Sequence, residues 1–381
     1  MHTLDAKETF AIEERDLSFF IEGAIDILAK DKIRSVPSSR RFRIIEKKKN
    51  VFQEIFTVFW SFFLWCFGGI LSNAVYSKTV ATLAQMFPDK SREDIQDERF
   101  LFGARKNFGR DAIPEIHNLE IPLFTKGSPL MKHFCRNVAN APALDDVYNI
   151  FGSFTVNGER VFPEAHKRDL LSLFHLGLCP NGFGVRWRYR TVIEEAQRAL
   201  SRKSEVSILS VACGSAQPVL HLSDILRNRG VKVKTTLTDA SQSALDLALR
   251  RAEEFGVSNL VESFQALFVK LRSKFAGQHF DLVEVCGLFD YCSDKAVSLC
   301  LKNALALGDV VLVSNMIDVP RESKMLRMAY NWEPVYRPPY ELASLLEKAG
   351  GQDIEVIVGP WGIHAVALAR SPMHYNNLEV E

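Results

Sequence analysis

From residue 205 onward, short β-branched runs alternate with segments of helical length. The sequence predicts strands at 206–211, 231–238, 260–266, 280–285 and 309–315, and helices at 218–229, 241–255, 294–307 and 339–349. Such alternation is typical of a parallel sheet with helices on both faces. Two further strands, 353–358 and 363–369, are joined by only four residues, which is too short for a parallel crossover. We therefore expect a doubly wound, mostly parallel seven-stranded α/β sheet that ends in an antiparallel hairpin.

The first predicted strand runs into a turn of small residues. From Ser210 the sequence reads SVACGSA, which places Ala212, Gly214 and Ala216 at alternate positions around Cys213. Small side chains let the backbone approach a ligand, and the helix that follows offers free N–H groups. The turn is a candidate cofactor site, although similar turns occur in many α/β proteins.

The second predicted strand ends in an acidic residue, Asp239, followed by Ala240. An acid at this point, some twenty residues beyond a glycine turn, is placed to bind ribose hydroxyls. The alternative is that Asp239 caps the helix that begins near Ser241, which is itself a plausible N-cap. The spacing favours the ribose role.

The fourth predicted strand carries a further group of candidates. Glu284 lies within it, and Cys286 and Gly287 follow at its carboxyl end. In open α/β sheets ligands bind at the carboxyl ends of the strands. We therefore include these three residues in the candidate cofactor site.

A doubly wound sheet that ends in one antiparallel hairpin resembles the class I methyltransferase fold. The resemblance implies S-adenosylmethionine as the cofactor, with Gln265 and Ala266 flanking its adenine. Ser210 stands where that family commonly has an acid, so contact with the methionine amino group lacks its usual residue. The main alternative is an NAD-binding Rossmann domain, which would require glycine at all three small positions.

At a finer grain, three stretches are similar to one bacterial group of methyltransferases. These are residues 208–216, 287–291 and 330–337, within a resemblance that covers 185–370. The group is identified with the synthesis of hydroxy-fatty-acid methyl esters. It implies methyl transfer to a small or lipid-like acceptor, most simply at a carboxyl or hydroxyl oxygen. Two alternatives stay open: a noncatalytic protein that keeps the fold, and another reaction of the same cofactor, such as aminopropyl transfer or cyclisation.

Methyl transfer requires that the acceptor be positioned in line with the methyl group, and sometimes a base. A carboxylate acceptor needs no base but does need a cation, and Arg337 is our candidate. Asp290 and Tyr291 are the other predicted catalytic residues. Phe289, Trp332 and Tyr336 are expected to form the walls of the acceptor pocket. The alternative is that the aromatic residues pack in the core and Arg337 forms a surface ion pair.

Residues 55–77 contain no charged side chain and are long enough to span a bilayer. Basic residues between 40 and 49 precede them, so a single span would place the later residues outside the cell. That conflicts with a domain that uses a cytosolic cofactor. Three alternatives stay open: a buried helix pair broken at Gly68 and Gly69, peripheral membrane contact through 40–77, or a channel for an apolar substrate.

The sequence predicts four parts. Residues 1–50 form a helix, about 13–29, and a basic connector; 51–200 are mostly helical and aromatic-rich, ending in a helix at 185–200. Residues 201–372 form the cofactor domain, and 373–381 a tail. We expect the N-terminal helices to cover the site as a lid that excludes water.

Charge and cysteine content exclude other classes. Lys and Arg number 47 against 46 for Asp and Glu, a net charge of +1, which disfavours a nucleic acid partner. The seven cysteines form no Cys-x-x-Cys pair, so we expect reduced thiols and no metal site. The acidic N-terminus does not resemble a cleavable signal peptide. These features predict a cytoplasmic protein, with contact at the inner face of the membrane as the open alternative.

Overall fold

The protein is described here from a computed structural model. The residues that it describes are 33–35, 42–49, 140–150, 154–156, 159–161, 172–320 and 334–372, with single or paired residues between 128 and 134, at 169, and between 322 and 332. The predicted helix at 13–29, the uncharged segment 55–77 and the tail 373–381 lie outside this part. Within the described residues, no helix has the length and apolar character needed to cross a membrane.

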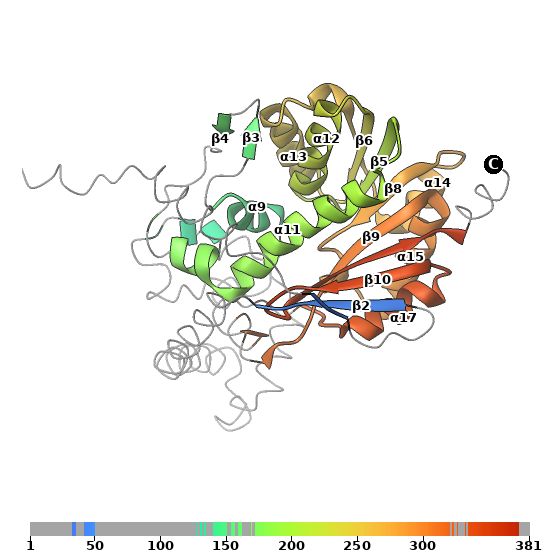
Figure 1. The fold of residues 1–381 in the computed structure, drawn as a ribbon. Helices are drawn as coiled ribbons and strands as arrows, with labels where there is room; N and C mark the ends of the chain where they lie inside the picture. The colour runs from blue at the N-terminus through green and yellow to red at the C-terminus, as the bar shows by residue number, and fades with distance from the viewer. Residues whose placement is uncertain are drawn as a thin grey trace, which may run out of the picture.

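A nine-stranded sheet forms the centre of the fold (Figure 1). Its strands are β1 (Ile33–Ser35), β2 (Phe42–Lys47), β5 (Glu205–Val211), β6 (Lys232–Asp239), β7 (Val261–Gln265), β8 (Phe280–Val285), β9 (Gly308–Met316), β10 (Gln352–Val358) and β11 (His364–Arg370). The order across the sheet is β1-β2-β10-β11-β9-β8-β5-β6-β7. Strands β5 to β9 are mutually parallel, and β11 lies antiparallel between β9 and β10. The predicted parallel sheet and the antiparallel hairpin are both confirmed.

Helices cover both faces of the sheet and bury a hydrophobic cluster on each. One face carries α11 (Pro180–Ala199), α12 (Gln217–Asn228) and α13 (Gln242–Glu254). The other carries α14 (Leu271–Lys274), α15 (Asp294–Leu307) and α17 (Pro339–Lys348). Serine caps fix where two of them begin: the Oγ of Ser241 accepts from the Ala244 N–H, and the Oγ of Ser293 from the Ala296 N–H.

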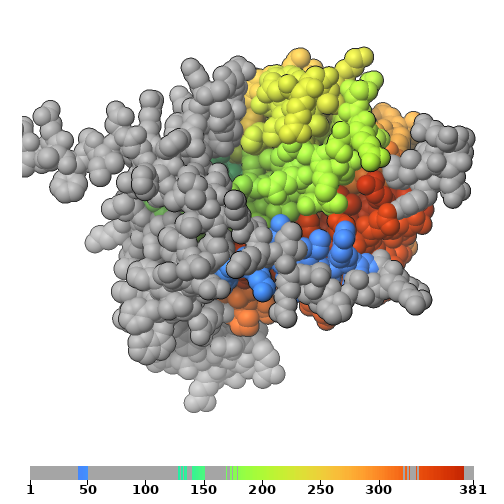
Figure 2. Space-filling view, viewed as in Figure 1, coloured from blue at the N-terminus to red at the C-terminus, as the bar shows by residue number. Residues whose placement is uncertain are grey.

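The structure departs from the sequence prediction at β1 and β2, which make the sheet nine-stranded instead of seven-stranded. Strand β2 lies in the predicted basic connector, yet it pairs in parallel with β10, with Phe42 opposite Ile354. Phe42, Ile44 and Ile45 pack against the hydrophobic clusters of the two faces. Arg43 forms an ion pair with Glu355. The space-filling view shows β2 at the surface beside the C-terminal strands (Figure 2). The connector prediction is therefore wrong for these six residues, because their alternate apolar side chains complete the sheet.

A short helix, a small hairpin and a π-helix (Leu173–Leu178) precede α11 in the sequence. Helix α9 (Ala141–Tyr148) packs against α11, and β3 (Phe154–Val156) pairs with β4 (Glu159–Val161) as a small hairpin. Helix α11 itself contacts α12, β9 and β11. It begins five residues earlier than predicted and forms part of the α/β layers.

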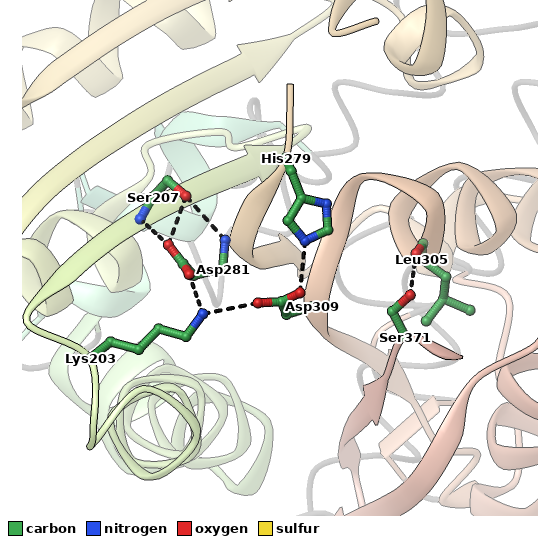
Figure 3. Close-up of polar contacts among 7 residues, drawn as sticks. All are labelled: Lys203, Ser207, His279, Asp281, Leu305, Asp309 and Ser371. Atoms are coloured by element: carbon green, nitrogen blue, oxygen red, sulfur yellow. Dashed lines mark hydrogen bonds and ion pairs between the residues drawn. The ribbon is translucent and has the colours of Figure 1, made fainter. Parts of the chain in front are cut away.

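A polar cluster ties together the amino ends of three parallel strands (Figure 3). Asp281 at the start of β8 accepts from the N–H and the Oγ of Ser207 on β5, at 2.7 and 2.8 Å. Lys203 bridges Asp281 and Asp309 of β9, and His279 also contacts Asp309, at 2.7 Å. Since the amino ends lie opposite the carboxyl ends, this cluster is remote from the expected ligand site and has a structural role.

Candidate active site

A cavity of about 460 Å³ lies at the carboxyl ends of β5, β6 and β8. Its lining comes from the turn after β5, the start of α13, the loop after β8, and the helices α9 and α11. The lining residues are Phe134, Asn140, Ala141, Pro142, Ala143, Leu144, Val147, Asn181, Val185, Arg188, Ala212, Cys213, Gly214, Asp239, Ser241, Ser243, Ala244, Cys286, Gly287, Leu288, Asp290, Tyr291 and Trp332. The cavity is thus where ligands bind in open α/β sheets.

The turn after β5 has left-handed backbone at every second residue. The φ angles are +52° at Ala212, +56° at Gly214 and +55° at Ala216. A residue with a Cβ is strained there by about 1–2 kcal/mol, so Ala212 and Ala216 are held in strained backbone, whereas Gly214 adopts it freely. The N–H of Cys213 donates to the Thr238 carbonyl at 3.0 Å and anchors the turn to β6. Strained backbone of this kind beside a cavity is typical of a ligand-binding turn.

Asp239 joins this turn to α13. One carboxylate oxygen accepts from the Gly214 N–H at 3.1 Å and the other from the Ser241 N–H at 2.9 Å. The N-cap of α13 is Ser241, so capping that helix is not the role of Asp239. Each carboxylate oxygen can accept a further hydrogen bond, which leaves Asp239 able to bind ligand hydroxyls.

An acid lies beside Ser210, although on the neighbouring strand. Ser210 on β5 is in register with Glu284 on β8, and its Oγ donates to the Glu284 carboxylate at 2.5 Å. Burial raises the pKa of Glu284. Neither residue lines the cavity, but Glu284 contacts Cys286, which does. Position 210 therefore lacks the acid that the family commonly has, but Glu284 on the neighbouring strand β8 supplies a carboxyl group beside it, behind the residues that line the cavity.

Half of the twelve predicted cofactor residues line the cavity and half do not. Those that do are Ala212, Cys213, Gly214, Asp239, Cys286 and Gly287; those that do not are Ser210, Ala216, Ala240, Gln265, Ala266 and Glu284. Gln265 donates to the Ala240 carbonyl at 2.9 Å, and the Ala266 N–H donates to the Asp239 carbonyl at 2.9 Å. These residues support the strand ends instead of forming the wall.

Arg337 is not available to an acceptor, so its predicted role is wrong. Its side chain is buried, and all five N–H groups donate within the protein. The acceptors are Asp294 Oδ1, twice, at 2.9 and 2.8 Å, the carbonyls of Phe289 and Cys292 at 2.8 and 2.6 Å, and Asn315 Oδ1 at 2.8 Å. Arg337 therefore fixes the loop after β8 to the end of β9.

The predicted aromatic walls are only partly present. Tyr291 and Trp332 line the cavity together with Asp290. Phe289 does not, because the short turn Phe289–Tyr291 directs it into the core beside α15. Tyr336 packs against the cluster that contains α9. Asp290 is buried and accepts from the Met316 N–H at 2.8 Å; burial raises its pKa.

Sequence reasoning missed the residues that α11 contributes. Asn181, Val185 and Arg188 follow each other at helical spacing and all line the cavity. Arg188 is 3% exposed; it donates to the Tyr148 hydroxyl at 3.2 Å, and its Nη1 lies 3.7 Å from Asp290 Oδ2. The spacing was visible in the sequence, but nothing local indicated which face of the helix meets the cavity.

Helix α9 is held over the cavity by a buried ion pair. Arg251 of α13 donates to the two carboxylate oxygens of Asp145 from Nε and Nη2, at 3.1 and 2.5 Å. Gln217 at the start of α12 donates to the same carboxylate at 2.5 Å. This clamp fixes the wall formed by Ala141 and its neighbours on the two helices behind it.

The order of the sheet, the antiparallel β11 and the small-residue turn after β5 define a Rossmann-like methyltransferase fold. The predicted fold class is confirmed for the part of the chain that the structure describes.

Comparison with solved structures finds several chains to which this one is similar. A possible exported protein from Bordetella parapertussis is 17% identical, with a TM-score of 0.56 over 79% of this chain and 97% of that one. The apo S-adenosylmethionine-dependent methyltransferase SibL is 16% identical (TM-score 0.43; 82% and 99% covered). A magnesium protoporphyrin IX methyltransferase from Synechocystis PCC 6803, with bound S-adenosylhomocysteine (SAH), is 13% identical (TM-score 0.42; 63% and 99% covered). No protein-family model matches the sequence, and no curated protein matches it.

Proposed function

We propose that this protein is an S-adenosylmethionine-dependent methyltransferase that methylates an oxygen of a small or lipid-like acceptor. The proposal rests on one observation: three features of the fold line the same cavity. These are the left-handed turn at Ala212 and Gly214, the carboxylate of Asp239 bonded to that turn, and the loop after β8.

The residues present fit this cofactor. Asp239 has free acceptor capacity for ribose hydroxyls, and Gly214 and Ala212 leave the turn open to close approach. Gly287, at φ +93°, likewise leaves the loop after β8 without a side chain at the lining. When bound, S-adenosylmethionine supplies an electrophilic methyl group on its sulfonium.

The rest of the lining suits an apolar acceptor. Leu144 and Val147 of α9, Val185 of α11, and Leu288 and Trp332 all face the same cavity. They exclude water and would pack against an aliphatic chain, which supports the resemblance to enzymes that methylate hydroxy fatty acids. A carboxylate acceptor needs no base. Two carboxylates of the described residues line the cavity, and Asp239 is assigned to the ribose, so for a hydroxyl acceptor Asp290 is the one that can take the proton.

The first test is calorimetry with S-adenosylmethionine and SAH on the whole protein. Asp239→Ala is expected to weaken the binding of both compounds by roughly 1–3 kcal/mol, which is the contribution of hydrogen bonds to a charged group. The matched control is Asp246→Ala, an exposed acid on α13 that does not line the cavity. Equal affinity for the folded Asp239 variant and the control would contradict the ribose assignment.

The second test separates methyl transfer from the alternatives. A cell extract is incubated with the protein and methyl-labelled cofactor, and the labelled product is identified by mass. Transfer adds one methyl group to the acceptor. Binding without any labelled product would favour a noncatalytic protein, and a different mass increment would favour another reaction of the cofactor.

A further inference from the structure

Arg188 is a buried cation in a mostly apolar cavity. Among the lining residues, it is the one Lys or Arg side chain, and it comes from the middle of α11. It adjoins the loop after β8, because a Cβ added at Gly287 would lie 3.9 Å from both Nη atoms. The guanidinium therefore lies where the proposed cofactor site meets the acceptor space.

The described part of the chain does not satisfy this guanidinium. Arg188 makes one hydrogen bond, to the Tyr148 hydroxyl, and its buried Nε has no partner in the described part of the chain. Arg337 shows what a satisfied buried arginine looks like in the same protein, since all five of its N–H groups are bonded. Buried charges are normally paired and hydrogen-bonded, so the lack at Arg188 indicates a ligand group.

Asp290 does not fill this role. Its Oδ1 accepts from the Met316 N–H, and its Oδ2 lies 3.7 Å from Arg188 Nη1, beyond hydrogen-bonding distance. The contact stabilises the charge of Arg188 without using its donors. Tyr148 contributes no charge, because burial raises the pKa of its hydroxyl.

We propose that Arg188 binds a ligand carboxylate through its guanidinium fork. Two parallel N–H···O bonds to a carboxylate match the planar geometry of arginine and would occupy two of its four remaining N–H donors. The carboxylate belongs either to the amino-acid part of the cofactor or to the acceptor. The proposal rests on the proposed function, and it gives the cavity the cation that Arg337 does not supply.

The experiment compares Arg188→Gln with Arg198→Gln, a control on the same helix whose side chain is 52% exposed. Calorimetry uses two pairs of probes that differ in a carboxylate. SAH is paired with 5′-methylthioadenosine, which has the same adenosine and sulfur but lacks the amino-acid part, both its carboxylate and its amino group. Decanoate is paired with decanamide, both in the presence of saturating SAH.

We expect Arg188→Gln to lose at least tenfold in affinity for the carboxylate member of one pair and to bind the neutral member unchanged. Loss for SAH assigns the group to the cofactor, and loss for decanoate assigns it to the acceptor. Arg188→Lys, which keeps the charge but not the fork, is expected to lose less. It also preserves the test if the Gln variant does not fold.

The proposal is overturned if Arg188→Gln and Arg198→Gln bind all four probes alike, or if the carboxylate and neutral members weaken equally. Failure of the proposed function looks different. In that case the unmutated protein binds neither SAH nor 5′-methylthioadenosine, while decanoate, measured alone, still depends on Arg188.

Discussion

The clamp between α9 and α13 allows a quantitative test of how the cavity wall is held. Asp145→Asn removes the charge that faces Arg251 while it keeps the volume of the side chain. Removing one partner of a buried ion pair costs about 3–5 kcal/mol, because the other charge stays buried. Glu254 also contacts Arg251, at 2.6 Å, and is partly exposed, so it offsets part of that loss. We therefore expect the free energy of unfolding to fall by about 3 kcal/mol.

Urea denaturation followed by tryptophan fluorescence measures this change, with an unchanged m-value as the sign that the folded state is intact. The control is Glu195→Gln, which breaks the exposed pair with Arg198 and should cost less than about 1 kcal/mol. The double variant Asp145→Leu/Arg251→Met should lose less free energy of unfolding than the sum of the losses in Asp145→Leu and Arg251→Met. A loss below about 1 kcal/mol in Asp145→Asn, or strict additivity in the double variant, would refute the clamp.

Three further outcomes are expected. Arg337→Lys should lower the free energy of unfolding by about 3 kcal/mol, because buried carbonyls lose their donors, and it should leave SAH affinity unchanged. Unchanged stability with weakened binding would instead indicate that Arg337 belongs to the ligand site. Burial opposes ionisation of Asp281, but hydrogen bonds from Lys203 and Ser207 outweigh it and lower its pKa. The resulting stabilisation is present above about pH 4 and is lost as the pH falls through the lowered pKa. In Lys203→Met, the free energy of unfolding from urea titrations should fall less steeply between about pH 5 and pH 2. An unchanged pH profile would contradict the stabilising role of Lys203 in the cluster. Ala212→Gly should raise the free energy of unfolding by about 0.5–1 kcal/mol by relieving the positive φ, and a decrease would mean that its Cβ contributes packing instead.

The sequence predicts the sheet from β5 onward because each signal there is local. Strands covered by helices on both faces read as β-branched runs, and the link before β11, five residues in the structure, is short enough to settle its direction. The sequence does not predict strand β2, because six residues bounded by basic side chains are equally compatible with a connector. Only its partner β10, far along the chain, makes it a strand.

The same division applies to the candidate site. The turn at Gly214 and the acid at Asp239 belong to strand ends, so the topology alone brings them together. Arg188 and Asp145 reach the site through the packing of α11 and α9, which no local pattern encodes. Arg337 was misjudged because a sequence does not reveal that backbone carbonyls will take up an arginine's donors.

The position of β2 has a consequence for the order in which the protein folds. Phe42 pairs with Ile354, although roughly three hundred residues separate them in the sequence. During synthesis β2 must therefore wait until β10 has left the ribosome, and closing so long a loop makes the pairing slow. Until then the newly made β10 presents an open sheet edge, on which another nascent chain can add a strand. Strand β2 is thus made early but joins β10 late. A chaperone that shields the open edge of β10 would act in the interval between these two events.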